Sequence, residues 1–281
     1  MAIEEILDLE QLEVNIFRGG VASPAPENRN RAFGGRVAGQ SLVSAVRTVD
    51  ERYRVHSLHS YFLLPGDAGA PTVFLVEHVR DGGSFCTRRV SAVQHGQNIF
   101  HMSASFQTPQ QGLAHQDEMP PAPDPEELPK VSRMKAFDGE AIKQFQEWDL
   151  RRVPRKLLDP KPGKVAQQQV WFRHRDPLPD DPVLHICALA YISDLTLLGT
   201  AWSIHPGECD VLQVASLDHA LWFMRPFRAD EWLLYDQSSP SAQAGRALTQ
   251  GKIFDRNGAM VAAVMQEGLT RFPHGYQPTP Q

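Results

Sequence analysis

Cysteine is scarce in this chain and follows no metal-binding or disulfide pattern. The three cysteines, Cys86, Cys187 and Cys209, lie far apart, and no CxxC occurs. An odd and widely spaced set gives neither a disulfide framework nor a zinc site, which predicts a reducing compartment. The sequence also lacks HExxH and GxSxG. We therefore expect no metal, no metalloprotease and no serine hydrolase of the α/β type.

Signals for export, membrane insertion and nucleotide cofactors are missing as well. The first ten residues, MAIEEILDLE, are acidic and do not resemble a signal peptide. We expect no apolar run of the roughly 18 residues that cross a bilayer, and the last residues carry no peroxisomal or ER address. GGRVAG at 34–39 is not the GxGxxG of dinucleotide-binding folds. The chain is expected to be cytoplasmic, with no membrane span and no cofactor.

The charge balance argues against one class of partner. Acidic residues outnumber basic ones by 33 to 28, giving a formal net charge of -5. Nucleic-acid binding favours a basic face, so we expect no nucleic acid as a partner. The length of 281 residues and a hydrophobic content of 42% suit two globular domains, each able to bury a core.

Two segments of the chain resemble each other. The first, 55–107, begins VHSLHSYFLLPGD, and the second, 215–268, begins ASLDHALWFMRPF. The same separation of 50 positions joins Ser57 to Gln107 and Ser216 to Gln266. Similar openings followed by equal spacing favour a duplicated unit.

Each copy is predicted to be a helix followed by strands. Apolar residues at helical spacing in 34–49 predict the first helix, and strand-like runs follow at 55–64, 72–80, 85–94 and 98–106. An apolar stretch at 185–199 predicts the second helix, before strands at 211–224, 232–238, 244–254 and 259–266. The fold class is therefore α+β, with two helix-plus-antiparallel-sheet repeats fused in one chain. Fusion is expected to place both sheets side by side and both helices in one interior.

The two repeats are separated by a segment that lacks their patterning. Residues 107–129 are rich in proline, which fixes φ and has no N–H for a sheet, so this segment is predicted to be a linker. The predicted units are an N-terminal domain over 1–107, a linker segment over 108–165 and a C-terminal domain over 166–281.

Several separate blocks, in order, resemble one known family. They are FGGRVAGQSL at 33–42, HSLHSYFLLPGD at 56–67, the stretch 79–107, YISDL at 191–195, SLDHALWFMRPF at 216–227 and MQEG at 265–268. In these blocks the chain resembles the type II acyl-CoA thioesterases, and the resemblance covers nearly the whole length. It implies a double hotdog fold, hydrolysis of fatty acyl-CoA to free acid and CoA, and a homo-oligomer, a dimer or higher.

The resemblance also implies a catalytic site. The water-activating residues of the family fall on Asp194 in YISDL, Ser216 in SLDH and Gln266 in MQEG. A carboxylate on an apolar helix is costly to bury unless it is paired, so Asp194 stands out in the sequence itself. Ser216 and Gln266 can each donate and accept hydrogen bonds, so the three side chains are suited to hold one water. The predicted C-terminal domain carries all three.

Two other functions remain open from the sequence. A hotdog enoyl-CoA hydratase or dehydratase would need an Asp and His pair, and a non-catalytic acyl-CoA-binding protein would tolerate loss of Asp194. Asp218 and His219 are adjacent, but neighbouring strand residues face opposite ways, so a dyad between them is not expected. Backbone N–H groups at the start of either helix are candidates to hold the thioester carbonyl oxygen.

The first copy is predicted to be a degenerate site. It has Ser57 and Gln107 but no carboxylate at the place of Asp194, where Gln40 is expected instead. We interpret this copy as a structural or CoA-binding unit. The residues expected to contact CoA, with arginines for its phosphates and glycines for close approach, are Gly82, Gly83, Phe85, Arg88 and Arg89.

Overall fold

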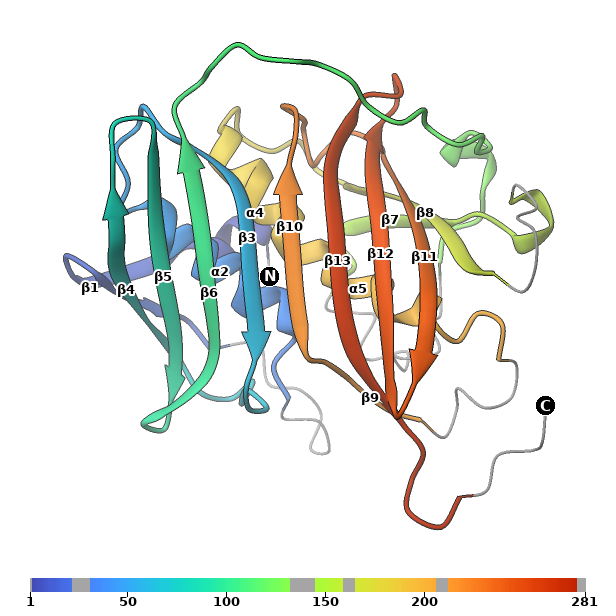
Figure 1. Cartoon of the computed structure of the whole chain (residues 1–281), viewed down its shortest axis with the longest axis horizontal. Helices are drawn as coiled ribbons and strands as arrows, with labels where there is room; N and C mark the ends of the chain where they lie inside the picture. Colours follow the sequence, from blue (N-terminus) through green and yellow to red (C-terminus); the bar gives the residue numbers. More distant parts are fainter. Residues whose placement is uncertain (1, 22–30, 132–144, 159–164, 206–211, 277–281) are drawn as a thin grey trace.

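The computed structural model describes residues 2–21, 31–131, 145–158, 165–205 and 212–276 (Figure 1). The first half contains one long helix and six strands. These elements are α1 (Ile3–Leu7), β1 (Leu9–Glu13), β2 (Ile16–Gly19), α2 (Gly34–Val46), β3 (Arg54–Phe62), β4 (Thr72–Asp81), β5 (Phe85–Gln94) and β6 (Gln97–Gln107).

The second half repeats this order with short helical turns added. Its elements are η1 (Pro125–Glu127), β7 (Trp148–Arg152), η2 (Arg155–Leu157), β8 (Ala166–His174), α4 (Pro182–Ile192), α5 (Asp194–Leu197), η3 (Leu198–Thr200), β9 (Gln213–Ser216), β10 (Asp218–Phe223), β11 (Leu233–Gln243), β12 (Arg246–Asp255) and β13 (Met260–Arg271). The predicted α+β class, with a helix before antiparallel strands in each repeat, is confirmed.

All strands in the described part of the chain join one sheet. Its order is β1-β2-β4-β5-β6-β3-β10-β13-β12-β11-β8-β7, with β9 pairing with β13 beside this path. The halves meet where β3 and β10 pair antiparallel, with Ser60 opposite His219. The Ser60 hydroxyl donates to the His219 carbonyl oxygen at 2.7 Å. The expected side-by-side arrangement of the two sheets is thus a continuous ladder (Figure 1).

The two long helices pack against each other behind the sheet (Figure 1). Glycine permits this approach at two positions on α2. A Cβ on Gly39 would lie 3.2 Å from the Cys187 carbonyl oxygen, and a Cβ on Gly35 would overlap the Tyr191 carbonyl oxygen. On α4, every residue from Cys187 to Ile192 is buried. Both helices therefore lie in one interior, as expected for the fused repeats.

The stretch around the second helix is longer and more apolar than expected from the sequence. Within the described residues, Pro182–Thr200 is long and apolar enough to cross a membrane by length and composition. Asp194 is its only charged residue. Most of this stretch is buried inside the protein. A core helix that is covered on most sides has the same composition as a membrane span, because both environments exclude charge.

The segment predicted to be a linker, 108–165, is partly sheet. Strand β7 lies within it and pairs with β8, with Leu150 opposite Phe172. The proline-rich part before it contributes Leu128 to an apolar cluster completed by Val153, Trp171, Trp232, Leu234 and Phe254. Two indole N–H groups bind this part of the chain, since Trp171 donates to the Pro123 carbonyl and Trp232 donates to Glu126. The segment thus packs on the C-terminal half of the sheet.

The equal spacing of 50 residues in the two copies does not reflect equal positions. Gln266 lies two positions before the strand partner of Ser216, whereas Gln107 lies two positions beyond the strand partner of Ser57. Strand register depends on turn lengths and bulges as well as residue counts, so the coincidence in spacing is misleading. The predicted equivalence of Gln107 and Gln266 is wrong.

Gln40 does not occupy the place of Asp194 either. It lies in the middle of α2, and its Nε2 donates to the Ile6 carbonyl oxygen at 2.7 Å. Asp194, in contrast, lies just beyond the C-terminal end of α4. Gln40 therefore ties α1 to α2, and the first copy has no counterpart of the acidic residue in its helix.

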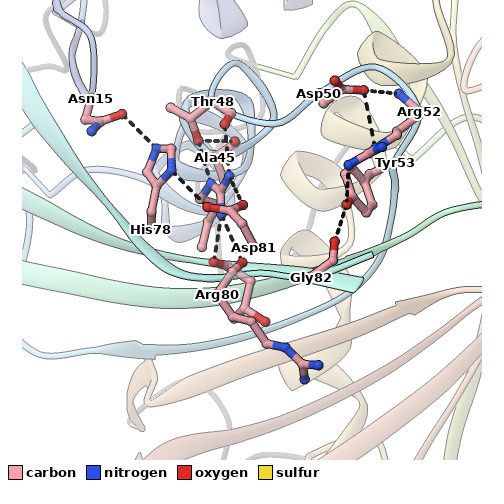
Figure 2. A network of polar contacts seen from close by, with 12 residues as sticks. Asn15, Ala45, Thr48, Asp50, Arg52, Tyr53, His78, Arg80, Asp81 and Gly82 are labelled. Atoms are coloured by element: carbon pink, nitrogen blue, oxygen red, sulfur yellow. Dashed lines mark hydrogen bonds and ion pairs between the residues drawn. The ribbon is translucent and has the colours of Figure 1, made fainter. Parts of the chain in front are cut away.

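A buried guanidinium ties the C-terminal end of α2 to the sheet. The Arg88 side chain is 4% exposed and donates to Thr48 Oγ1, the Thr48 carbonyl and the Arg80 carbonyl at 3.1–3.3 Å. Its Nη2 also lies 2.6 Å from Asp81 Oδ1. Thr48, Arg80 and Asp81 are labelled in Figure 2, where Asp81 also contacts His78. Arg88 is a structural residue, because several hydrogen bonds hold its charge inside the fold.

The helix contact at Gly35 gives a testable prediction. Gly35→Ala would force α2 and α4 apart, because the new Cβ meets the Tyr191 backbone, which cannot rotate away. We expect a loss of about 3 kcal/mol in the free energy of unfolding, measured by urea denaturation. Gly20→Ala is the matched control, since a Cβ at Gly20 meets nothing within 4 Å. Equal stability of the two variants would contradict the close approach.

Candidate active site

Asp194 lies at a break between two helices. Helix α4 ends at Ile192, Ser193 follows, and Asp194 is the first residue of α5. Its side chain is held inside the protein, with the residue only 8% exposed. A carboxylate in such a place must be paired with donors to remain ionised.

Three donors meet the Asp194 carboxylate. The Gly35 backbone N–H donates to Oδ2 at 3.0 Å. The Ser216 hydroxyl and the Gln266 amide Nε2 donate to Oδ1 at 2.9 and 2.8 Å. Gln266 Nε2 also lies 2.6 Å from Ser216 Oγ. The structure thus brings together all three side chains that the sequence predicted to be catalytic.

Strand pairing brings Ser216 and Gln266 to this carboxylate. Ser216 ends β9 and lies opposite Gly268 of β13, two positions after Gln266. Gln266 is fully buried, while Ser216 is partly exposed. A Cβ at Gly268 would overlap the Leu198 side chain, so this glycine lets η3 and the end of α5 approach the sheet. Ser216 is therefore the most exposed of the three residues.

The N-terminal half supplies the helix start that faces Asp194. A Cβ at Gly34 would lie 2.8 Å from Asp194 Oδ2, so the carboxylate approaches the first turn of α2 closely. The partial positive charge at a helix N-terminus stabilises an anion there. The Gly35 N–H, one of the groups expected to hold the thioester carbonyl, binds Asp194 instead. The site is thus built from both halves of the chain.

A second layer of polar groups lies behind the carboxylate. His219 is fully buried, and its Nε2 lies 2.9 Å from the Ser193 hydroxyl oxygen. Burial lowers the pKa of His219, so its imidazole is neutral near pH 7. The Tyr235 hydroxyl donates to the Ser193 carbonyl at 3.3 Å. Burial, and then the charge of Asp194, raises the pKa of Tyr235, which therefore stays protonated.

From the sequence, no role is predicted for His219 and a different partner is expected for the Gly35 N–H. Asp218 and His219 do face opposite sides, since Asp218 accepts from the Glu267 N–H while His219 points into the core. Because a dyad of Asp218 and His219 was not expected, His219 was given no role. Its place in the block SLDH, which begins with Ser216, is the signal in the sequence that could have indicated one. The contact from Gly35 to Asp194 spans 159 positions, and no local pattern signals it.

The five residues expected to contact CoA lie away from Asp194. Arg88 binds Thr48, just past the C-terminal end of α2, whereas Asp194 binds the N-terminal end. The 13 residues of α2 separate these ends by about 20 Å. Arg88 faces inward, and Arg89 faces outward, where its Nη1 lies 3.2 Å from Glu77. Phe85 is 39% exposed, and a Cβ at Gly83 would meet open space.

The group at Asp194 has the donors and acceptors to hold a water molecule. An ionised carboxylate offers about four acceptor positions, and three donors occupy three of them. Oδ1 accepts from Ser216 and Gln266, whereas Oδ2 accepts from Gly35, so the remaining position is on Oδ2. No group of three or more His, Cys, Asp or Glu side chains suited to a metal ion occurs among the described residues. A carboxylate held by donors, with one acceptor position left, is suited to activate a water.

Two family models match the chain, one in each half. A model described as acyl-CoA thioesterase N-terminal domain matches residues 21–107, and one described as acyl-CoA thioesterase matches residues 140–269. Their order and extent agree with the duplicated architecture. The second matched region contains Asp194, Ser216 and Gln266.

Curated relatives and solved structures cover nearly the whole chain. It is 38% identical to human acyl-coenzyme A thioesterase 8, over 96% of this chain and 88% of that protein. It is 37% identical to acyl-CoA thioesterase 2 of Haemophilus influenzae, over 95% of this chain and 96% of that one.

The similarity to solved structures extends to the three-dimensional fold. An acyl-CoA thioesterase II from Mycobacterium marinum is 70% identical, with a TM-score of 0.88 over 98% of this chain and 100% of that one. A hot dog fold protein from Alicyclobacillus acidocaldarius, 20% identical, has a TM-score of 0.78 over 97% and 99% of the two chains, which supports the fold alone. The fold is a double hotdog, and the chain belongs to the type II acyl-CoA thioesterase family.

Proposed function

We propose that this protein hydrolyses fatty acyl-CoA to free fatty acid and CoA by direct attack of a water bound at Asp194. As a family member the chain is an acyl-CoA thioesterase, and the proposal concerns how its residues act. The observation that carries it is the convergence of Ser216 Oγ and Gln266 Nε2 on one carboxylate oxygen. Ser216 and Gln266 are suited to orient a water, and the carboxylate of Asp194 is suited to take its proton.

Asp194 acts as the general base. Its carboxylate is buried, so the acceptor position left open by Gly35, Ser216 and Gln266 is desolvated apart from the attacking water. A general base of this kind contributes roughly 10²- to 10⁴-fold to the rate. The helix start of α2 stabilises the negative charge of Asp194 before proton transfer.

Ser216 and Gln266 orient the water rather than attack the substrate. Ser216 Oγ is held by both Gln266 Nε2 and Asp194 Oδ1, so its hydroxyl proton is directed at the carboxylate. No neutral histidine lies at hydrogen-bond distance from Ser216 among the contacts of the described residues. The carboxylate that accepts the Ser216 proton is proposed to serve the water instead, and the Ser216→Ala variant separates these two roles.

The leaving group needs little help. A free thiol has a pKa of about 8.5, so the CoA thiolate leaves readily from a tetrahedral intermediate. A strong general acid is therefore unnecessary, and the protonated Asp194 is able to return its proton to the departing sulfur. Such a leaving group suits a site with one carboxylate, to which no second acidic group is bound among the described residues.

The binding of CoA is a further proposal. Gly82, Gly83, Phe85 and Arg89 are proposed to contact the nucleotide end of CoA, which lies far from the thioester. Arg88 would support this surface from inside the fold, because Asp81 and Thr48 already bind its guanidinium. A homo-oligomer, a cytoplasmic location and the absence of a nucleic-acid partner stay predictions.

The role of Asp194 is tested by Asp194→Asn. We expect kcat for acyl-CoA hydrolysis to fall by about 10³-fold, because an amide cannot take the proton of the water. Release of free thiol from a series of acyl-CoA esters measures the rate, and binding of a CoA ester is measured in parallel. A variant as fast as the wild type would remove Asp194 as the base. Hydration of enoyl-CoA without thioester hydrolysis would support the hydratase reading instead.

The role of the Ser216 hydroxyl is tested by a pair of variants. Ser216→Ala is expected to lower kcat by roughly 10- to 100-fold, because one of the groups that orients the water is lost. Ser216→Thr keeps a hydroxyl and is expected to recover at least about tenfold of that loss. Equal residual activity of the Ala and Thr variants would contradict an orienting role, and an inactive Ser216→Ala beside an active Ser216→Thr would indicate a nucleophile.

Neighbouring arginines give a matched test of the CoA surface. Arg88→Met is expected to lower the free energy of unfolding by about 2 kcal/mol, because Thr48 and Arg80 carbonyls lose their donor. Arg89→Met is expected to change it by less than about 0.5 kcal/mol, since its pair with Glu77 is exposed. Calorimetry should find CoA bound about fivefold more weakly by Arg89→Met. Unchanged affinity in that variant would remove Arg89 from the binding surface.

A further inference from the structure

Two buried polar atoms beside the site have no hydrogen-bond partner of good geometry. They are Gln266 Oε1 and His219 Nδ1. Both residues are fully buried. Because an unpaired polar group in a core is costly, two such atoms in neighbouring side chains point to a contact between them.

The strand register places these two side chains opposite each other. In the β10–β13 ladder, Ala220 lies opposite Met265, so one position further along His219 lies opposite Gln266. Directly opposed residues in an antiparallel pair point to the same face, with Cβ atoms about 5 Å apart. A hydrogen bond to the Gln266 side chain is also among the causes that act on the pKa of His219.

Asp194 decides which way the Gln266 amide points. Its carboxylate accepts hydrogen bonds only, so the amide must present Nε2, at 2.8 Å, to Oδ1. Turning the amide around would set Oε1 against a carboxylate oxygen and leave a buried charge facing an acceptor. The amide oxygen is therefore fixed toward His219, where it requires a donor.

The other end of the imidazole agrees with this assignment. A neutral imidazole carries one N–H, so an N–H at Nδ1 leaves Nε2 as the acceptor. The Ser193 hydroxyl oxygen lies 2.9 Å from Nε2, closer than the 3.3 Å that separates it from the Ala190 carbonyl. Ser193 then donates to His219, His219 to Gln266, and Gln266 to Asp194, which directly follows Ser193 in the chain.

We propose that His219, as its Nδ1–H tautomer, is a positioning residue that fixes the Gln266 amide toward Asp194 and Ser216. His219 does not touch the substrate. It closes a ring of donors that begins and ends on the adjacent residues Ser193 and Asp194. Its effect on the rate rests on the hydrolysis proposed above, while its tautomer does not depend on any reaction.

Two substitutions of His219 test its two ring nitrogens separately. In His219→Asn, the side-chain amide stands near the place of Nδ1 and is able to donate to Gln266. In His219→Gln, it stands near the place of Nε2 and reaches Ser193 instead. We expect His219→Gln to lower kcat by roughly 10- to 100-fold with KM within about twofold, and His219→Asn to lose at least about fivefold less.

Matched controls separate positioning from general damage to the core. His185 is also buried, lies on α4 about 13 Å along the helix from Asp194, and accepts from the Ala229 N–H. His185→Asn and His185→Gln are expected to change kcat equally. In a protein that already carries Gln266→Ala, adding His219→Gln is expected to lower kcat by less than about twofold further, because the amide that His219 positions is gone. Equal losses in the two His219 variants, or full additivity with Gln266→Ala, would overturn the proposal.

The tautomer is measured directly on the full-length protein. Long-range ¹H–¹⁵N correlation spectra of ¹⁵N-histidine-labelled protein, with the His219 signals assigned from His219→Asn, are expected to show a protonated Nδ1 and an unprotonated Nε2. An Nε2–H tautomer would overturn the proposal even if every kinetic prediction held. If the wild type fails to hydrolyse acyl-CoA while the Nδ1–H form is present, the proposed function fails and the hydrogen-bond assignment stands.

Discussion

The hydrogen bond from the Gly35 N–H to the Asp194 carboxylate is the contact on which the site depends. It joins the start of α2 in the first half to the end of α4 in the second. The helix start needs an acceptor for its free N–H groups, and the buried carboxylate needs donors, so each satisfies the other. Both glycines at the start of α2 are required for this approach, because a Cβ at either would meet Asp194 or Tyr191. Neither half of the chain is able to form this carboxylate environment alone.

The two copies have diverged around a common framework. Each keeps a helix followed by antiparallel strands, and β3 and β10 join the copies into one ladder. The two ends of α2 make different contacts. Its N-terminal end faces the Asp194 carboxylate, whereas its C-terminal end is tied to the sheet by Arg88, where a cation pairs well with the last carbonyls. A duplicated fold thus carries one polar site at the interface of its helices and one structural tie at the far end.

Several hydrogen-bonding side chains lie in the core near α5, and they are able to lie there because they bind one another. Gln168 and Gln237 are buried close to the main site, and each donates to Thr196, through the backbone carbonyl and the hydroxyl respectively. A network of this kind is stable only when its members are paired, and then it holds one arrangement firmly. The rigid setting around Asp194 suits a group that must orient a water within a few tenths of an ångström.

The sequence by itself determined the two long helices and the strands that follow them, the duplication and the candidate side chains at Asp194, Ser216 and Gln266, but not the strands β1, β2, β7 and β8. Periodicity and turn residues carry that information locally, and the ordered blocks of the family carry the rest. It failed where position depends on pairing: equal spacing did not make Gln107 the counterpart of Gln266, and an arginine at position 88 that looked available for phosphate is buried. Only the tertiary structure decided strand register, the face that each side chain occupies and the partners of Asp194. The partners of Asp194 are 22, 72 and 159 positions away from it in the chain, and no local pattern encodes such contacts.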